Sequence, residues 1–277
     1  MKQRLKILSA GHRIVREKNK IFMKYAILGS GSSANSYIFE EDDFAFVVDN
    51  GFSLKEFSNR ALELGFDISK IKYIFLTHKH ADHSRGIDTL SKTLKIPVVM
   101  SSDLFLNKSE AKKIYKRLNV KPGEKYDYGK LSFSVFPISH DSEGSVSYSF
   151  NFSGYIFTII TDTGKILKEM EPHVINADIL FLEANYCPQM LAEGPYPLYL
   201  KKRIESHHGH LSNDDAIGFL SGIYGSMQIK NRMTYLCHMS DTNNCYNKLE
   251  NIIRDSMPES FRYRICRKGE LVEGIAL

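Results

Sequence analysis

Three histidines and one aspartate stand within six residues, in the segment THKHADH at Thr77–His83. The segment follows an apolar run, residues 73–76, that predicts a buried strand. Because alternate residues of an extended chain share a face, His78 and His80 are expected to point one way while a turn directs Asp82 and His83 to a second point. Imidazoles with carboxylates and no thiolate favour Zn²⁺, with Mn²⁺ or Fe²⁺ as alternatives. The segment therefore predicts ligands for two divalent metal ions.

Three more candidate ligands stand where other predicted strands end. His140 follows the strand at 132–136, Asp162 follows 155–160 and His238 follows 233–237. Strands that end at one edge of a sheet bring such residues together, and one carboxylate can bridge two metals. The predicted ligands of the first metal are His78, His80, His140 and Asp162, and those of the second are Asp82, His83, Asp162 and His238.

The order of predicted elements indicates an α/β fold. Strands are expected at 24–28, 36–40, 44–48, 73–76, 97–100 (an edge strand), 132–136, 147–152, 155–160, 179–182 and 233–237. Helices are expected at 54–64, 89–94 and 102–118, and from residues 197, 212 and 241 onward. Strands and helices that alternate between two β-rich stretches favour two sheets covered by helices on their outer faces, an αββα sandwich.

Charge divides the chain into a basic N-terminal extension, residues 1–22, expected to be flexible, and one hydrolase domain, residues 23–277. The extension holds seven Lys or Arg against one Glu, a net charge of +6, so the rest carries −1 against a total of +5. Phosphate attraction in the domain is therefore expected from metals and local clusters. Because the sequence has no secretory signal and no apolar run of membrane length, we expect a cytoplasmic protein without membrane contact. The sequence does not determine the oligomeric state, and a homodimer is one of the alternatives.

The motif His78-x-His80-x-Asp82-His83, with the three later ligands, resembles the dinuclear signature of the metallo-β-lactamase superfamily. Four further segments resemble the WalJ/YycJ family, identified as 5′-to-3′ DNA exonucleases: 29–36, 183–186, 194–197 and 209–213. The resemblance implies a four-layer αββα hydrolase that acts on DNA through two metal ions. It also implies that Asp49 orients a ligand histidine, whereas an ordinary turn residue is the alternative reading.

The expected mechanism is attack on phosphorus by a metal-activated hydroxide, with Asp82 and His210 as the predicted catalytic residues. His210 is the candidate acid for the leaving oxygen, or alternatively a packing residue or extra ligand. Ser30, Ser32 and Asn35 are candidate phosphate contacts in the turn after the first strand. The basic run at residues 201–203 is a candidate contact for the strand's backbone, although such a run is usually a solvated face.

Alternative functions share the metal ligands. A small-molecule phosphodiesterase that resembles PhnP, and opens cyclic phosphates, would use the same His210. A thioesterase or lactonase of the glyoxalase II type shares the metal loop but gives no reason for the segment 194–213. A metal-stabilised binding module without turnover is disfavoured because every candidate ligand is present.

Overall fold

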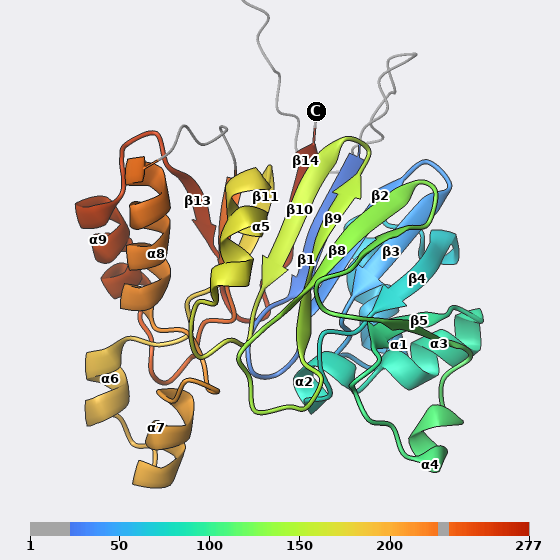
Figure 1. The fold of residues 1–277 in the computed structure, drawn as a ribbon, viewed down its shortest axis with the longest axis horizontal. Helices are drawn as coiled ribbons and strands as arrows, with labels where there is room; N and C mark the ends of the chain where they lie inside the picture. Colours follow the sequence, from blue (N-terminus) through green and yellow to red (C-terminus); the bar gives the residue numbers. More distant parts are fainter. Residues whose placement is uncertain (1–22, 227–232, 277) are drawn as a thin grey trace, which may run out of the picture.

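A computed structural model describes residues 23–226 and 233–276, and the predicted extension at 1–22 lies outside them. The described strands form two sheets of seven (Figure 1). The first, in spatial order, contains β14 (Val272–Ala276), β1 (Met23–Gly29), β2 (Ser36–Glu41), β3 (Phe44–Val48), β4 (Ile71–Phe75), β5 (Val98–Ser101) and β6 (Arg117–Val120). The second contains β13 (Arg262–Ile265), β12 (Met233–Cys237), β11 (Ile179–Glu183), β10 (Tyr155–Ile160), β9 (Val146–Phe152), β8 (Leu131–Pro137) and β7 (Lys125–Asp127).

Helices cover the outer face of each sheet, which confirms the predicted αββα sandwich. With the first sheet lie α1 (Leu54–Glu63), η1 (Ile68–Lys70), α2 (Ala81–Ser84), α3 (Ile87–Leu94) and α4 (Lys108–Ala111). With the second lie η2 (Lys168–Met170), α5 (Glu171–Asn176), α6 (Pro188–Glu193), α7 (Leu198–Ile204), α8 (Asn213–Ser226) and α9 (Tyr246–Ser256). None of these described helices is long and apolar enough to span a membrane.

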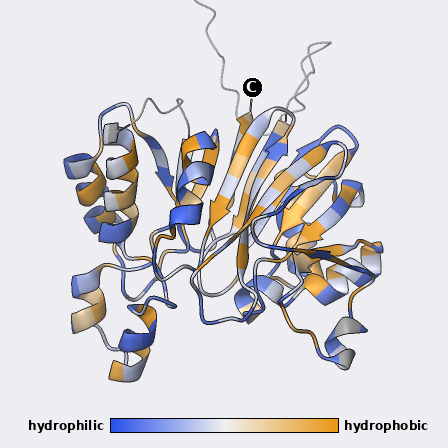
Figure 2. Ribbon diagram, in the orientation of Figure 1, coloured by the Kyte–Doolittle hydropathy of each residue, from blue (hydrophilic) through white to orange (hydrophobic). Residues whose placement is uncertain are grey.

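Strand alternation explains why the sheets stack. In β3, Phe44, Phe46 and Val48 face an aromatic-rich core between the two sheets, while Ala45 and Val47 face the core under the helices of the first sheet. A strand buried on both faces needs such an unbroken apolar run, since successive side chains point to opposite sides. In Figure 2 hydrophobic residues run along the strands, while the helices carry both hydrophobic and hydrophilic residues.

The prediction of one helix over residues 102–118 is wrong. Only the four residues of α4 are helical, starting where the Asn107 side chain accepts the backbone N–H groups of Ser109 and Glu110. Arg117 then begins β6, and its guanidinium donates to the carbonyls of Ser101, Ser102 and Leu104. The Lys-rich segment therefore takes its shape from contacts with distant parts of the chain.

Other differences concern the borders of the sheets and the helices, of which α2, α5 and α6 were not predicted. The strand expected at the edge, β5, is buried and pairs with both β4 and β6, because the unpredicted strand β6 covers it. Strands β7, β13 and β14 were also not predicted, and the helix expected from residue 241 begins at Tyr246. In the second sheet, the strands that precede the candidate ligands, β8, β10 and β12, run in one direction, so their carboxyl ends meet at one edge. In the first sheet, β4 precedes the ligand segment and runs parallel to β3, which precedes Asp49.

Candidate metal centre

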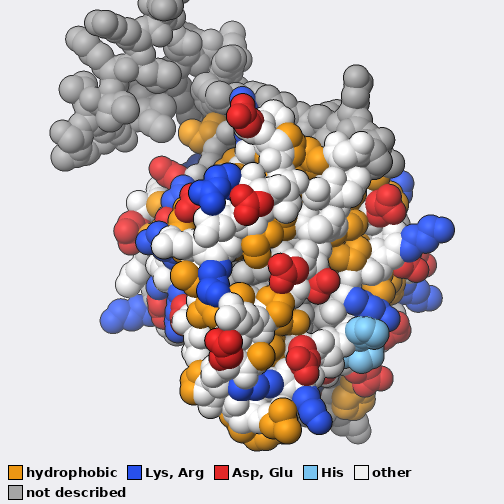
Figure 3. Space-filling model, turned by 90° about the vertical axis from the view of Figure 1, so that its left-hand side faces the viewer, with side chains coloured by type: hydrophobic (Ala, Val, Ile, Leu, Met, Phe, Trp, Pro, Cys, Tyr) orange, Lys and Arg blue, Asp and Glu red, His pale blue; other side chains and the backbone are white. Residues whose placement is uncertain are grey.

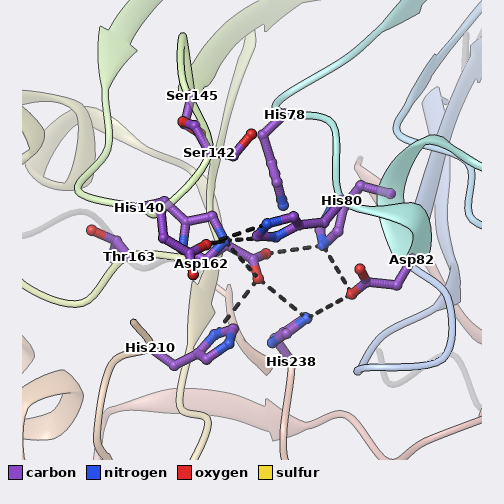
Figure 4. Close-up of polar contacts among 12 residues, drawn as sticks. His78, His80, Asp82, His140, Ser142, Ser145, Asp162, Thr163, His210 and His238 are labelled. Atoms are coloured by element: carbon purple, nitrogen blue, oxygen red, sulfur yellow. Dashed lines mark hydrogen bonds and ion pairs between the residues drawn. The ribbon is translucent and has the colours of Figure 1, made fainter. Parts of the chain in front are cut away.

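The structure brings all seven predicted ligands together at the carboxyl ends of the strands (Figure 4). One group contains His78, His80 and His140, and a second contains Asp82, His83 and His238. In each group the candidate ligand atoms lie within 4.8 Å of one another. Asp162 lies between the groups, with Oδ2 3.0 Å from His83 Nε2 and Oδ1 3.4 Å from His238 Nε2 and 4.0 Å from His140 Nε2. A single carboxylate thus faces both groups.

Each candidate ligand histidine has one ring nitrogen held by the protein. Nδ1 of His83 lies 2.7 Å from Asp49 Oδ2, and Nδ1 of His140 lies 3.1 Å from the carbonyl oxygen of Gly209. Nδ1 of His78 lies 3.0 Å from the Thr77 hydroxyl. The other ring nitrogen of each of these histidines is thereby directed toward the shared centre, the arrangement that fixes metal-binding imidazoles.

His80 has the opposite orientation. Its Nε2 lies 3.3 Å from Asp141 Oδ1, while its Nδ1 faces His140 Nε2 at 3.0 Å. Asp141 in turn accepts the Nε–H of Arg203 at 2.6 Å. Asp141 follows the ligand His140 directly in the sequence, and it was not predicted to take part in the site.

Backbone conformation helps to turn these side chains inward at the strand ends. Asp49, Asp162 and His238 have φ values of 56°, 58° and 56°, in the left-handed region that side chains other than glycine adopt at a cost. Each follows the end of its strand by one or two residues. The surrounding hydrogen bonds, such as that from the backbone N–H of His238 to Ser30 Oγ at 2.7 Å, hold this conformation.

Glu183, the last residue of β11, is a buried carboxylate that sequence reasoning missed as a site residue. Its Oε1 lies 2.8 Å from His210 Nδ1 and 3.2 Å from His238 Nδ1, so one oxygen orients both rings. Its Oε2 accepts the backbone N–H of Thr163 at 2.9 Å. Although these oxygens are close enough to join a metal group, we read Glu183 as an orienting residue because its hydrogen bonds already engage both.

The pKa shifts of the candidate ligands suit the binding of a cation at this centre. Burial raises the pKa of Asp162, but the imidazoles of His238 and His83 outweigh burial and hold the pKa well below its ordinary value. Burial lowers the pKa of His78 well below its ordinary value, which favours the neutral imidazole that binds metals. Among the described residues, His78 Nε2 is buried without a hydrogen-bond partner. A buried imidazole nitrogen of this kind, near the carboxylate of Asp162, fits a divalent metal ion.

The three residues predicted to contact phosphate differ in their exposure to solvent. Ser30 is buried and its hydroxyl accepts from the backbone of His238, while Asn35 is buried with its amide nitrogen 2.8 Å from His83 Nε2. Both residues therefore help to hold the ligand loops, and their contact with a phosphate stays a prediction. Ser32 is exposed, and its phosphate contact stays a prediction.

His210 stands beside the centre on the loop before α8. Its Nδ1 is 3.6 Å from Asp162 Oδ1 as well as 2.8 Å from Glu183, and its side chain is partly exposed. The sequence predicted that His210 lies near the ligands, but it did not show which group would orient the imidazole ring. The contact with Glu183 leaves Nε2 available to a substrate.

Comparison with known proteins agrees with this geometry. The model of the beta-lactamase superfamily domain matches residues 45–239. Exodeoxyribonuclease WalJ of Streptococcus pneumoniae (strain D39) is 31% identical over 82% of this chain and 85% of its own, and exodeoxyribonuclease YycJ of Bacillus anthracis is 27% identical over 80% and 84%. The metallo-beta-lactamase fold protein YhfI of Bacillus subtilis superposes with a TM-score of 0.65 at 16% identity, over 91% of this chain and 100% of its own. The chain therefore belongs to the beta-lactamase superfamily and, within it, to the family of WalJ and YycJ.

Proposed function

We propose that the protein is a metal-dependent phosphodiesterase that degrades DNA as an exonuclease, from the 5′ end. The observation that carries this proposal is Asp162, one carboxylate that faces two groups of metal-binding side chains at a partly open edge of the fold. The names of the relatives WalJ and YycJ, both exodeoxyribonucleases, support DNA as the substrate. A DNA substrate also supports the cytoplasm as the site of action.

Two divalent metal ions fit the ligand set, with Zn²⁺ or Mn²⁺ as the first candidates and iron as an alternative. His78, His80 and His140 would hold one, Asp82, His83 and His238 the other, and Asp162 would contact both. Such ions supply a water of lowered pKa as nucleophile and stabilise negative charge on the phosphate oxygens. Among the ligands proposed for the second ion, Asp82 is the most exposed, with 20% of its side chain accessible, which is the basis for its proposed catalytic role.

His210 is the proposed proton donor to the leaving oxygen. Its Nδ1–H is directed to the Glu183 carboxylate, so the ring is held in one orientation and Nε2 carries the transferable proton. Protonation matters for DNA because the leaving sugar oxygen is a strong base once its bond to phosphorus breaks. In this proposal Glu183 is a positioning residue that acts through His210 and His238.

The test is degradation of end-labelled single- and double-stranded DNA in Mn²⁺ and in Zn²⁺, comparing the unmodified chain with His80→Ala and Asp162→Ala. Asp43→Ala is the matched control, since this carboxylate is exposed and pairs with Lys130 away from the centre. Stepwise loss of the 5′ label, abolished by either ligand substitution and kept in the control, is the expected result. Turnover of a cyclic phosphodiester without DNA cleavage would instead support the PhnP-like alternative, and turnover of thioesters the glyoxalase II-like one.

A further inference from the structure

We propose that the exposed side of α7 is the surface along which a single-stranded nucleic acid approaches the metal centre. In this proposal the ring of Tyr199 stacks on a base and the ammonium group of Lys202 pairs with a backbone phosphate. We call Leu198, Tyr199 and Lys202 the α7 platform. The inference rests on the proposed nuclease function and adds to it the path of the strand.

The platform exposes large side chains without a covering element in the described structure. Leu198 is 67% exposed and Tyr199 is 74% exposed, and they are adjacent in the sequence. Large apolar side chains that stand exposed together indicate a binding surface. A tyrosine ring suits bases in particular, because every base has a flat face and stacking tolerates any sequence.

The opposite side of α7 anchors the helix. Ile204 is buried in a small core with Tyr186 and Leu191, and Leu200 packs against the same core. Leu200 and Ile204 are four residues apart and so lie on one face of the helix. The exposed side is therefore presented on a fixed support.

Two polar contacts connect α7 with the metal centre. The Nε–H of Arg203 donates to Asp141 Oδ2 at 2.6 Å, and Asp141 Oδ1 lies 3.3 Å from Nε2 of the candidate ligand His80. Tyr199 stands four residues before Arg203, hence on the same face and slightly more than one helical turn, roughly 6 Å, farther along the axis. The platform thus lies on the same helix face as Arg203, which is linked to the ligand His80 through Asp141, and it extends from there away from the centre. Figure 1 shows α6 and α7 below the second sheet.

One of the three basic residues of α7 is available to contact a phosphate. Of its three basic residues, Arg203 is engaged by Asp141, and Lys201 donates to the carbonyl of Ala192 at 2.6 Å. Lys202 is exposed, and its ammonium group makes no ion pair or hydrogen bond with another described residue. Lys202 and Tyr199 are three residues apart, which makes them neighbours on the helix surface and able to contact one nucleotide together.

The wider surface supports a local contact rather than attraction by a large basic field. Figure 3 shows acidic and basic side chains interspersed over this side of the molecule, with hydrophobic side chains beside Lys or Arg at its lower end. Without a broad field, affinity for a strand must come from direct stacking and single phosphate contacts. That requirement favours a single strand, whose bases are accessible, over an intact duplex.

The experiment measures the binding of a labelled single-stranded oligothymidylate to the metal-loaded full chain by fluorescence anisotropy. The oligonucleotide has phosphorothioate linkages, which slow its cleavage. Tyr199→Ala is expected to weaken binding by about 5-fold or more, the loss of one base stack, and Tyr199→Phe to retain it. Lys202→Ala is expected to lower the slope of log affinity against log salt by about 0.7. Lys55→Ala, an exposed lysine of α1, is the matched control and should leave affinity and slope unchanged.

A parallel assay with bis(para-nitrophenyl) phosphate, too small to reach α7, should give equal turnover in all four variants. Equal affinity of Tyr199→Ala and the unmodified chain, or no binding of the oligonucleotide, would overturn the platform. Self-association that Tyr199→Ala abolishes, with DNA affinity unchanged, would assign the surface to a second copy of the chain and also overturn it. Cleavage of natural DNA by the unmodified chain tests the nuclease separately, since weakened binding without any cleavage would keep the platform and refute the nuclease.

Discussion

Oε1 of Glu183 lies 2.8 Å from Nδ1 of His210, deep in the fold at the end of β11. Burial raises the pKa of Glu183, but the charge and hydrogen bond of His210 and the hydrogen bond of His238 outweigh burial and lower it overall. Glu183 is therefore an anion that accepts Nδ1–H from the imidazole. The contact fixes the orientation of the ring and directs Nε2 toward the proposed substrate.

Replacing Glu183 with glutamine should reduce kcat on DNA by about 100-fold or more, because a neutral amide accepts Nδ1–H more weakly than a carboxylate and no longer holds Nε2–H of His210 toward the substrate. The shape of the side chain is kept, so the fold should persist. Steady-state kinetics would be compared with Asp43→Asn as the control, and metal content would be measured by mass spectrometry. Full activity in Glu183→Gln would show that the carboxylate only fills space.

Substitution of His210 by alanine should slow DNA cleavage by about 10² to 10⁴, the usual contribution of a general acid. The effect on bis(para-nitrophenyl) phosphate should be less than about 10-fold, since para-nitrophenolate leaves without a proton. The ratio of the two rates is the measurement, and His207→Ala, an exposed histidine of the same loop, is the control. Equal losses on both substrates would instead identify His210 as a metal ligand.

The sequence predicted the fold class and the convergence of the ligands because both depend on local patterns. Apolar strands that end in His or Asp must deliver those residues to one edge when the strands run parallel, as β10, β11 and β12 do. Glu183 follows the same pattern at the end of β11, and the signal was available. It was missed because a glutamate after a strand is usually solvated, whereas here it is buried by the loop that carries His210.

Features that depend on distant contacts could not be predicted. The segment 102–118 contains good helix formers, yet Arg117 binds three carbonyls of the preceding loop and extends the first sheet instead. The contacts of Asn35 with Asp82 and His83 were also not predicted, because these residues lie forty-seven and forty-eight positions away in the sequence. Likewise, only the tertiary structure places Arg203 against Asp141.

Asp141→Asn should weaken metal binding by about 10-fold, because the carboxylate that orients His80 through Nε2 is replaced by a neutral amide. Titration of the metal-free chain with Mn²⁺, followed by calorimetry, gives the affinity. Asp43→Asn is a close control, since Asp43 is likewise 2.6 Å from a basic side chain, that of Lys130, but lies away from the metal centre. An affinity equal to that of the unmodified chain would remove Asp141 from the support of the site.

Gly51→Ala should destabilise the fold and disturb the ligand loop together. A Cβ at Gly51 would lie 2.0 Å from the carbonyl oxygen of Asp82 and 2.9 Å from Cα of Ala34, so the backbone on one side must move. That carbonyl accepts the backbone N–H of Asn35 at 2.7 Å, and the neighbouring carbonyl of His83 accepts from Asn50 at 2.7 Å, which ties the ligand segment to the turn that would be displaced.

Overpacking of this kind costs about 1–3 kcal/mol, which should lower Tm by roughly 2–4 °C per kcal/mol in thermal unfolding. Metal affinity should fall in the same variant, because Asp82 and His83 move with the backbone. Gly218→Ala in α8 is the control: a Cβ there meets nothing within 4 Å, and alanine favours a helix. A Gly51→Ala variant with unchanged Tm and metal affinity would mean that the turn and the ligand segment shift without cost, and that their close packing does not hold the metal ligands in place.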